Sequence, residues 1–154
     1  FKVNRVKFFN INDLDLSLIK LPEEDCVISK IVAAINMLVE RDKMKKLLVI
    51  EMNSFLKELG VLSEKIIDGK SATVINNSSG NYGIIGVEVN EGGKTYQKIL
   101  YTDKGKDFVL EVLSRLASER WYKIYYLRKY SGMHKTWYED IGKHVEKNKL
   151  HLEI

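Results

Sequence analysis

The chain has 154 residues, of which 45% are hydrophobic and 30% charged, and it contains a single proline. These values fit one globular domain with a substantial core and exclude a disordered or collagen-like chain. No apolar run approaches the roughly 20 residues of a membrane helix, and no signal-peptide pattern is visible, so we expect a cytoplasmic protein without membrane contact.

The net charge of +4 and the isoelectric point near 9.0 permit a nucleic-acid partner without requiring one. The single cysteine, Cys26, cannot form an internal disulfide, which favours a reducing compartment. Three acids directly precede it, and negative neighbours raise the pKa of a thiol. We therefore expect Cys26 to be buried or inert.

The N-terminal third predicts one short strand and one helix. Residues 1–21 indicate a short strand followed by an irregular, partly buried approach segment. The helix is predicted from about Asp25 or Ser29 to Glu40, and the acids at 23–25 suit its N-terminus. Its apolar positions recur at helical spacing: Ile28, Ile31, Val32, Ile35 and Leu38 or Val39.

Residues 44–62 predict two further short helices ahead of Gly60, the second at about 50–59. Gly60 stands where a left-handed C-terminal cap belongs, and Leu62 is expected to pack back on the helix. The apolar positions that form one face are Leu48, Met52, Phe55, Leu56 and Leu59.

The period then changes from helical to extended. Residues 71–75 are β-prone, and residues 76–83 are rich in turn formers. The segments 84–89 and 94–102 flank Asn90-Glu91-Gly92-Gly93, which predicts a β-hairpin because the glycines supply positive φ angles.

A long helix is predicted from Asp103, and its period extends through Trp121, Ile124 and Leu127. A last short helix is expected at about 136–147, and the tail from Leu150 to Ile154 fits an edge strand. The face of the long helix is formed by Phe108, Val109, Val112, Leu113, Leu116 and Ala117. We expect the side chains of Ile35, Leu56, Val112 and Leu116 to be buried together.

The order helix, short helix, helix, hairpin, helix is that of a winged helix-turn-helix. The predicted fold class is therefore α+β, in one domain spanning residues 1–154. We place the winged-helix core at about 25–116 and a C-terminal helical extension at about 117–154.

Two segments, MNSFLKELGVL (52–62) and KTYQKILYTDKGKDFVLEVL (94–113), resemble the C-terminal domain of phage antirepressor proteins. In that family an N-x-x-L-x-x-x-G-x-L helix is followed by a hairpin and a T-x-K-G-x-x-F turn into a helix. The first pattern is matched by Asn53, Leu56, Gly60 and Leu62, and the second by Thr102, Lys104, Gly105 and Phe108. The resemblance covers about residues 45–115. It implies a winged helix in a DNA-linked setting, with a regulatory or accessory role in prokaryotes or phages.

The first candidate surface is the exposed face of the helix at 50–59, which in a helix-turn-helix enters the major groove. Asn53, Ser54 and Lys57 suit bases and phosphates, whereas Glu51 and Glu58, also expected to point outward, weaken the field. In the alternative, this helix only packs or contacts protein. On the hairpin wing, Lys94 and Lys98 are candidate phosphate contacts.

The second candidate surface is the segment 120–138, which holds seven of the fifteen aromatic residues and no acid. Cations attract phosphates, and aromatic rings stack on unpaired bases. The candidate contacts are Arg120, Lys123, Arg128, Lys129 and Lys135. In the alternative, the segment fills the core or a dimer seam.

Other motifs carry little chemistry. Residues 80–83 fit turn geometry and lack the phosphate-loop pattern. The three histidines lack zinc-site spacing. We therefore expect no catalytic residue, no metal and no cofactor.

The first functional hypothesis is a DNA-binding winged helix, with double- or single-stranded DNA as the partner and a role such as transcription regulation. The alternative is a protein-interaction or homodimerisation module, antirepressor-like and without direct DNA contact. A third hypothesis is an enzyme fragment whose catalytic residues lie outside the chain.

Overall fold

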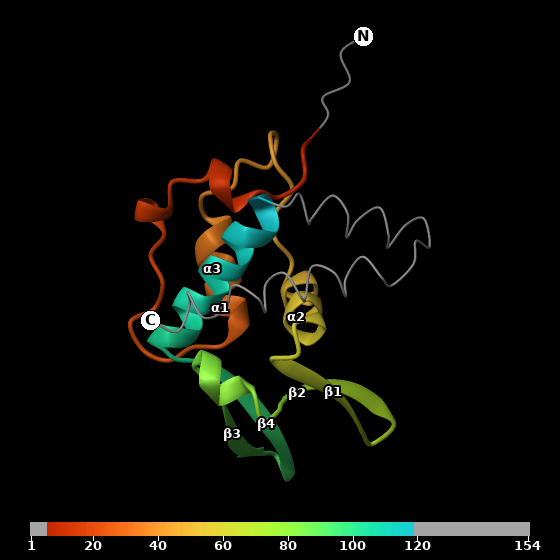
Figure 1. The fold of residues 1–154 in the computed structure, drawn as a ribbon. Coiled ribbons are helices and arrows are strands. Elements are labelled where there is room, and N and C mark those ends of the chain that lie inside the picture. Colours follow the sequence, from red (N-terminus) through yellow and green to blue (C-terminus); the bar gives the residue numbers. More distant parts are fainter. Residues whose placement is uncertain (1–5, 119–154) are drawn as a thin grey trace.

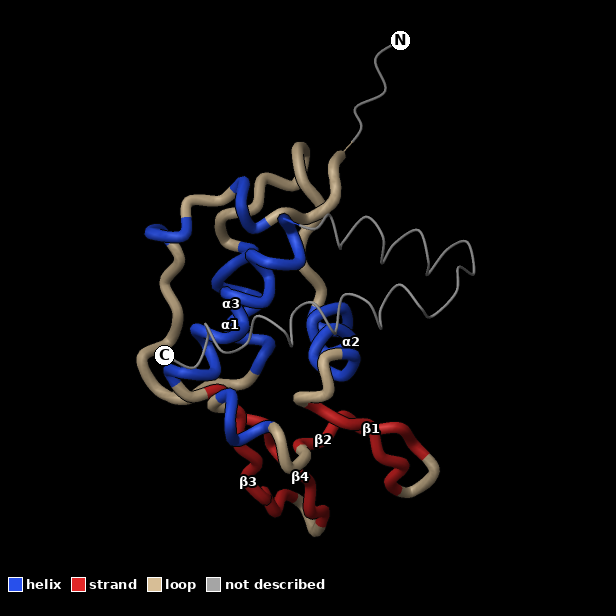
Figure 2. Tube along the Cα trace, viewed as in Figure 1, coloured by secondary structure: helices blue, strands red, loops and turns tan. Residues whose placement is uncertain are grey.

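The computed structural model describes residues 6–118, with side chains through residue 115 (Figure 1). Within these residues the fold is α+β, as predicted. Three α-helices gather at one end, and two antiparallel hairpins project from the other (Figure 2). The helix expected at 136–147 and the edge strand expected at 150–154 lie outside the described residues.

The N-terminal segment holds two short 3-10 helices, η1 (Ile11–Asp13) and η2 (Leu16–Leu18). Of the strand expected ahead of them, the described part contains only an isolated parallel bridge between Lys7 and Met44. Phe9 and Ile11 are buried, as expected for a partly buried approach segment, so this segment joins the hydrophobic core although it precedes the winged-helix core placed at about 25–116.

Helix α1 (Ile28–Asn36) buries Ile31, Val32 and Ile35 but ends four residues before the predicted Glu40. The side chain of Asn36 turns to the following loop, where its Nδ2 donates to Leu47 O (2.8 Å) and its Oδ1 accepts from Leu47 N (2.9 Å). The expectation that the acids at 23–25 stabilise the N-terminus of α1 is not met, because no acid lies in its first turn.

The short helix predicted between α1 and α2 is absent, and residues 37–48 form turns and extended chain. Lys7 N donates to Lys43 O (3.2 Å), and Lys45 N donates to Lys7 O (2.9 Å). These backbone groups therefore bond to a segment nearly 40 residues away instead of closing a local helix. Met44 and Leu47 are buried through this pairing.

Helix α2 (Val49–Glu58) and its cap agree with the prediction. Gly60 has a φ of +79°, and Val61 N donates to Leu56 O (3.1 Å) while Gly60 N donates to Lys57 O (3.0 Å). This is the Schellman pattern of a glycine-terminated helix. Val61 and Leu62 are buried directly behind it.

The first hairpin pairs β1 (Leu62–Ile67) with β2 (Lys70–Ile75), and only β2 was foreseen from the sequence. Its turn, Asp68-Gly69, has positive φ angles at both residues (52° and 76°), as the twist of a two-residue hairpin turn requires.

The second hairpin, β3 (Ile84–Glu91) with β4 (Lys94–Tyr101), confirms the predicted pairing. Its register runs from Ile84 opposite Tyr101 to Glu91 opposite Lys94. Gly92 and Gly93 form the turn, with φ angles of 58° and 77°.

Helix α3 (Asp103–Ser118) begins at the predicted residue and buries Phe108, Val109, Val112 and Leu113. Ile35, Leu56 and Val112 are all fully buried in the same core cluster, as expected. The side chain of Leu116, the fourth member of that expected group, lies outside the described side chains.

Candidate nucleic-acid interface

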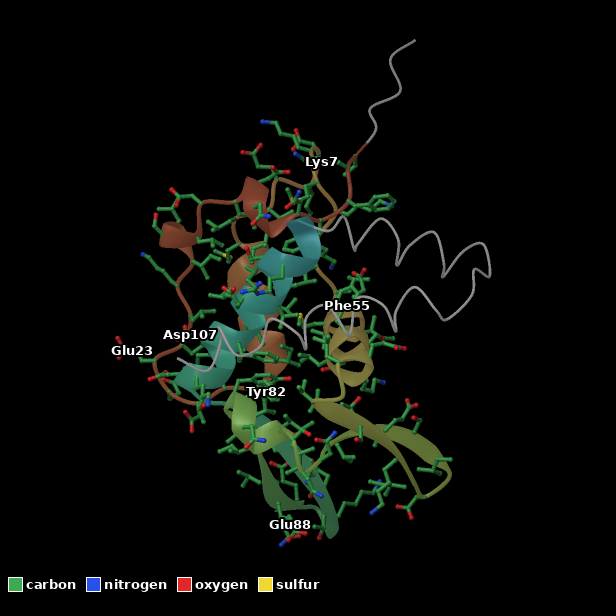
Figure 3. The ribbon with its side chains drawn as sticks, viewed as in Figure 1. Lys7, Glu23, Phe55, Tyr82, Glu88 and Asp107 are labelled. Carbon is green, nitrogen blue, oxygen red and sulfur yellow. The ribbon has the colours of Figure 1, made fainter. Side chains whose placement is uncertain are left out.

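Helix α2 leads from the loop at 37–48 to the first hairpin, so its exposed face links those two elements (Figure 1). Met52, Phe55 and Leu56 anchor its other face in the core. The side chain of Phe55 is labelled in Figure 3.

Asn53, Ser54 and Lys57 lie on one side of α2 and are partly exposed. Their spacing of three and four residues places them on one helical stripe. Ser54 Oγ donates to Ile50 O (2.9 Å), so this hydroxyl is bound to the helix backbone. The structure therefore brings together the three polar residues that the sequence predicted for this helix.

The expected outward position of Glu51 is wrong, because its side chain is buried. Its Oε1 accepts from Leu48 N (3.1 Å), which satisfies a backbone donor at the helix N-terminus. The exposed face therefore carries one glutamate, Glu58, instead of two, and its negative charge is smaller than the sequence suggested.

An open depression of about 710 Å³ lies where α2 meets the first hairpin. Lys57 Nζ lies 3.4 Å from Glu64 Oε1 across it. Hydrogen bonds from Ser71 and Lys57 hold the pKa of the Glu64 carboxyl below its usual value. The depression is lined by Ser54, Lys57, Glu58, Gly60, Leu62, Ser63, Glu64 and Asn76.

Asn76 fixes the root of the first hairpin to the end of α2. Its Nδ2 donates to Gly60 O (3.0 Å) and to Ser63 Oγ (2.8 Å). Ser79 Oγ also donates to Val61 O (2.6 Å). Because these bonds cross the junction, the hairpin is held in a defined direction relative to the exposed face of α2.

The hairpin adjoining α2 carries two lysines that sequence reasoning missed. Lys65 is paired with Ala72, and Lys70 with Ile67, which places both lysines on one face of β1–β2. Both are exposed. The signal that could have found them was Asp68-Gly69, a strong hairpin-turn dipeptide lying between them.

The two lysines predicted on the wing belong to the other hairpin, β3–β4. Lys94 follows the glycine turn opposite Glu91, and Lys98 lies opposite Val87. Both are exposed. This hairpin also carries Glu88 and Glu91, so its formal charge is zero.

The loop ahead of α2 carries a further group of cations. One of them is partly neutralised, since Lys43 Nζ lies 2.8 Å from Glu40 Oε2. Outside the loop, Lys7 Nζ lies 2.7 Å from Asp13 Oδ2. Lys45 Nζ lies 5.1 Å from the centre of the Phe8 ring. Lys7 lies at the far end of the molecule from Glu88 on the second hairpin (Figure 3). The basic residues of the loop are Arg41, Lys43, Lys45 and Lys46.

The net charge of the chain arises mostly at its ends. Residues 6–118 contain 15 lysines and arginines against 16 acids, a formal charge of −1, whereas the whole chain carries +4. The predicted contacts Arg120, Lys123, Arg128, Lys129 and Lys135 lie outside the described residues. Because residues 6–118 have almost no net charge, a phosphate-binding surface among them requires lysines that lie close together in space.

The residues behind the family resemblance serve mainly to hold the fold together. Thr102 Oγ1 donates to Gly83 O (2.8 Å) and accepts from Gly105 N (3.3 Å) at the start of α3. A Cβ on Gly105 would lie 2.4 Å from Gly83 O, so only glycine allows this contact. Phe108 packs on Tyr82, with ring centroids 4.6 Å apart. Among the residues that match the two family patterns, Lys104 and Asn53 are the ones whose side-chain polar groups are accessible.

Cys26 is buried, as expected, and burial raises the pKa of its thiol. Its backbone pairs with Tyr101 at the end of β4. The thiol is therefore a poor nucleophile at neutral pH, because the reactive species is the thiolate.

No protein-family model, characterised protein or solved structure matches this chain. Among the described residues, no helix combines the length and apolarity needed to cross a bilayer.

Proposed function

We propose that this protein is a DNA-binding module of the winged-helix type, in which α2 enters the major groove and the first hairpin, β1–β2, is the wing beside it. The observation that carries the proposal is the partly exposed polar stripe of Asn53, Ser54 and Lys57 on α2, which lies in the chain between the basic loop at 41–46 and the hairpin β1–β2. The resemblance of the sequence to phage antirepressor domains supports a regulatory role of prokaryotic or phage type.

The residues on this surface divide into two groups. Lys45, Lys46, Lys65 and Lys70 are exposed on the elements before and after α2 in the chain. Lys65 and Lys70 lie on the face of β1–β2 opposite Glu64, and in the proposal all four lysines contact the phosphates of a bound duplex. Asn53 and Ser54 lie between them on α2 with short polar side chains suited to base edges. Lysines supply affinity without sequence information, so specificity would depend mainly on Asn53 and Ser54.

The loop at 37–48 takes the place of the tight turn or short helix that usually precedes a recognition helix. Asn36 and Lys7 pin it through backbone hydrogen bonds. Lys45 and Lys46 are thereby held within four residues of the first residue of α2. Phosphates bind readily near helix N-termini, since the backbone N–H groups point outward there.

The proposal is tested by electrophoretic shift of double- and single-stranded probes over a range of salt concentrations. A Lys65→Ala/Lys70→Ala variant should bind duplex more weakly, and the slope of log affinity against log salt should fall by nearly two units. The matched control is Lys20→Ala/Lys30→Ala, which removes two exposed lysines outside this surface.

Two results would overturn the proposal: no duplex binding by the unmodified protein at about 50 mM salt, or equal slopes for the two double variants. A Lys94→Ala/Lys98→Ala variant shows separately whether the second hairpin also touches phosphates.

A further inference from the structure

One face of the second hairpin is mostly apolar, and no element of the described residues 6–118 covers it. The register places Ile85, Val87 and Val89 of β3 on the same face as Leu100, Lys98 and Tyr96 of β4. Ile85, Val87 and Tyr96 are 38%, 40% and 46% exposed. None of the five apolar residues packs against the core cluster formed by the described residues.

The opposite face of the same hairpin is already occupied. A Cβ on Gly86 would lie 2.8 Å from Ile75 Cδ1, and Gln97 Oε1 accepts from Ile75 N (3.0 Å). This face packs on the root of the first hairpin. The apolar face therefore points away from the other described elements, and an exposed apolar patch of this size is often functional.

This face is complementary to the same face of a second copy. Two copies can face each other across a two-fold axis that runs parallel to the strands, midway between the two hairpins. In this arrangement each residue of β3 packs on the residue of the partner's β4 that has the same number as its own cross-strand neighbour. Ile85 then faces Leu100, and Val89 faces Tyr96, which is apolar against apolar.

At the tip of the hairpin, the same symmetry places Glu91 of each copy over Lys94 of the other, which gives two equivalent ion pairs. With the axis across the strands at Val89 and Tyr96 instead, Lys94 would lie over Lys98 of the partner, a like-charge contact. With that axis at the middle of the four pairs, Lys94 would lie over Leu100 and Glu91 over Ile85, and no ion pair would form. The arrangement along the strands is therefore favoured.

The apolar face is small, which limits the strength of the contact. Three exposed side chains and two half-buried neighbours offer roughly 300–400 Å² per copy, against about 800 Å² per partner in a standard interface. A contact of this size gives a weak dimer that depends on concentration.

We propose that the apolar face of β3–β4 pairs two copies of this protein, with reciprocal Glu91–Lys94 ion pairs at the tips. The proposal does not depend on DNA binding. It places Lys98 between the two apolar pairs of the interface, where its aliphatic stem covers Val87 of the partner and its ammonium reaches solvent beside the hairpin.

Sedimentation velocity of the full chain without DNA, from about 10 μM to about 1 mM, tests the pairing in the weak range expected for so small an interface. The weight-average sedimentation coefficient should rise with concentration, and Val87→Asp should abolish the rise. Ile66→Asp, the matched control on the other hairpin at a residue 75% exposed, should leave the rise unchanged. Circular dichroism melts of both variants verify that each is folded.

The charge arrangement is tested by exchange. Glu91→Lys and Lys94→Glu should each reduce dimerisation about tenfold or more, and the double exchange should restore it, because the reciprocal pair is formed again with its signs reversed. A constant sedimentation coefficient for the unmodified chain would overturn the proposal. So would equal effects of Val87→Asp and Ile66→Asp, or a double exchange that restores nothing.

Discussion

At the scale of single residues, Gly105 makes the closest backbone contact at the start of α3. Its missing side chain leaves room for the carbonyl of Gly83, which a Cβ would approach to 2.4 Å. Gly105→Ala should therefore lower the free energy of unfolding by about 1–3 kcal/mol, because neither backbone can move without straining the other. Urea denaturation measures the loss. Gly80→Ala, where a Cβ meets nothing within 4 Å, should stay within about 0.5 kcal/mol, and equal losses would contradict the explanation.

The Tyr101 hydroxyl is buried with no hydrogen-bond partner among the described residues, and desolvation raises its pKa above the usual value. Tyr101→Phe should cost less than about 1 kcal/mol or even stabilise, because an unsatisfied buried hydroxyl is unfavourable.

The same hydroxyl gives a pH dependence. The phenol ionises more easily in the unfolded chain than in the folded one, so its contribution to stability is present below about pH 10 and is lost as the pH rises further. Stability measured by urea should fall more steeply above pH 10 in the unmodified protein than in Tyr101→Phe. Parallel curves for the two proteins would contradict this expectation.

Single residues also show what the sequence could not reveal. Glu51 was expected to point outward on α2, but its carboxylate accepts from Leu48 N and is buried. The capping-box signal begins with a serine or threonine three residues earlier, and here that position is leucine. Thr102, Gly105 and Phe108 were recognised as a pattern, but only the structure shows that the pattern serves the contact between η3 (Ser79–Tyr82) and α3.

At the scale of elements, signals within a few residues were reliable. The glycine turn predicted β3–β4, and Gly60 predicted the end of α2. Strand β1 was missed because Leu62–Ile67 lacks regular alternation, with two adjacent isoleucines exposed at its end. The short helix expected between residue 44 and the helix at 50–59 is absent, because the chain there is not helical and the burial of Met44 and Leu47 depends on distant pairing with Lys7 and Asn36.

The glycine cap of α2 supports a prediction about that element. Gly60→Ala should lower the free energy of unfolding by about 1–2 kcal/mol, the cost of a left-handed conformation with a Cβ. No atom lies within 4 Å of the added Cβ, so backbone strain is the only source. Gly60→Asn should cost clearly less, because asparagine tolerates this conformation. If both variants lose the same amount, as measured by urea denaturation, the cap is not the cause.

At the scale of the whole molecule, the structure depends on contacts between segments far apart in sequence. The N-terminal segment, the loop at 37–48 and helix α3 take part in hydrogen bonds to groups 11 to 102 residues away. Such contacts leave no periodic trace in the sequence. For this reason α1, α2, α3, the second hairpin and the polar stripe of α2 could be predicted, whereas the course of the connecting segments and the hairpin beside α2 could not.

Lys106 is the strongest of these long-range links. Its ammonium group is buried and donates to Pro22 O and Glu24 O, each at 2.7 Å, so one cation on α3 holds the loop that precedes α1. Lys106→Met keeps the length of the side chain but leaves these carbonyls without their charged donor. We expect a loss of about 2–4 kcal/mol in the free energy of unfolding, since hydrogen bonds to charged groups contribute about 1.5–3 kcal/mol each and burial of the charge offsets part of that.

The control for Lys106 is its ion-pair partner. Asp103 lies 3.2 Å from the ammonium, but its side chain is 88% exposed, so Asp103→Ala should cost less than about 1 kcal/mol. Hydrogen exchange locates the effect: in Lys106→Met the amides at 23–27 should exchange faster while those of α2 keep their order of protection, because the lost bonds hold only that loop. Equal losses for the two variants, or faster exchange spread evenly over all helices, would show that Lys106 does not act as a link between α3 and the loop.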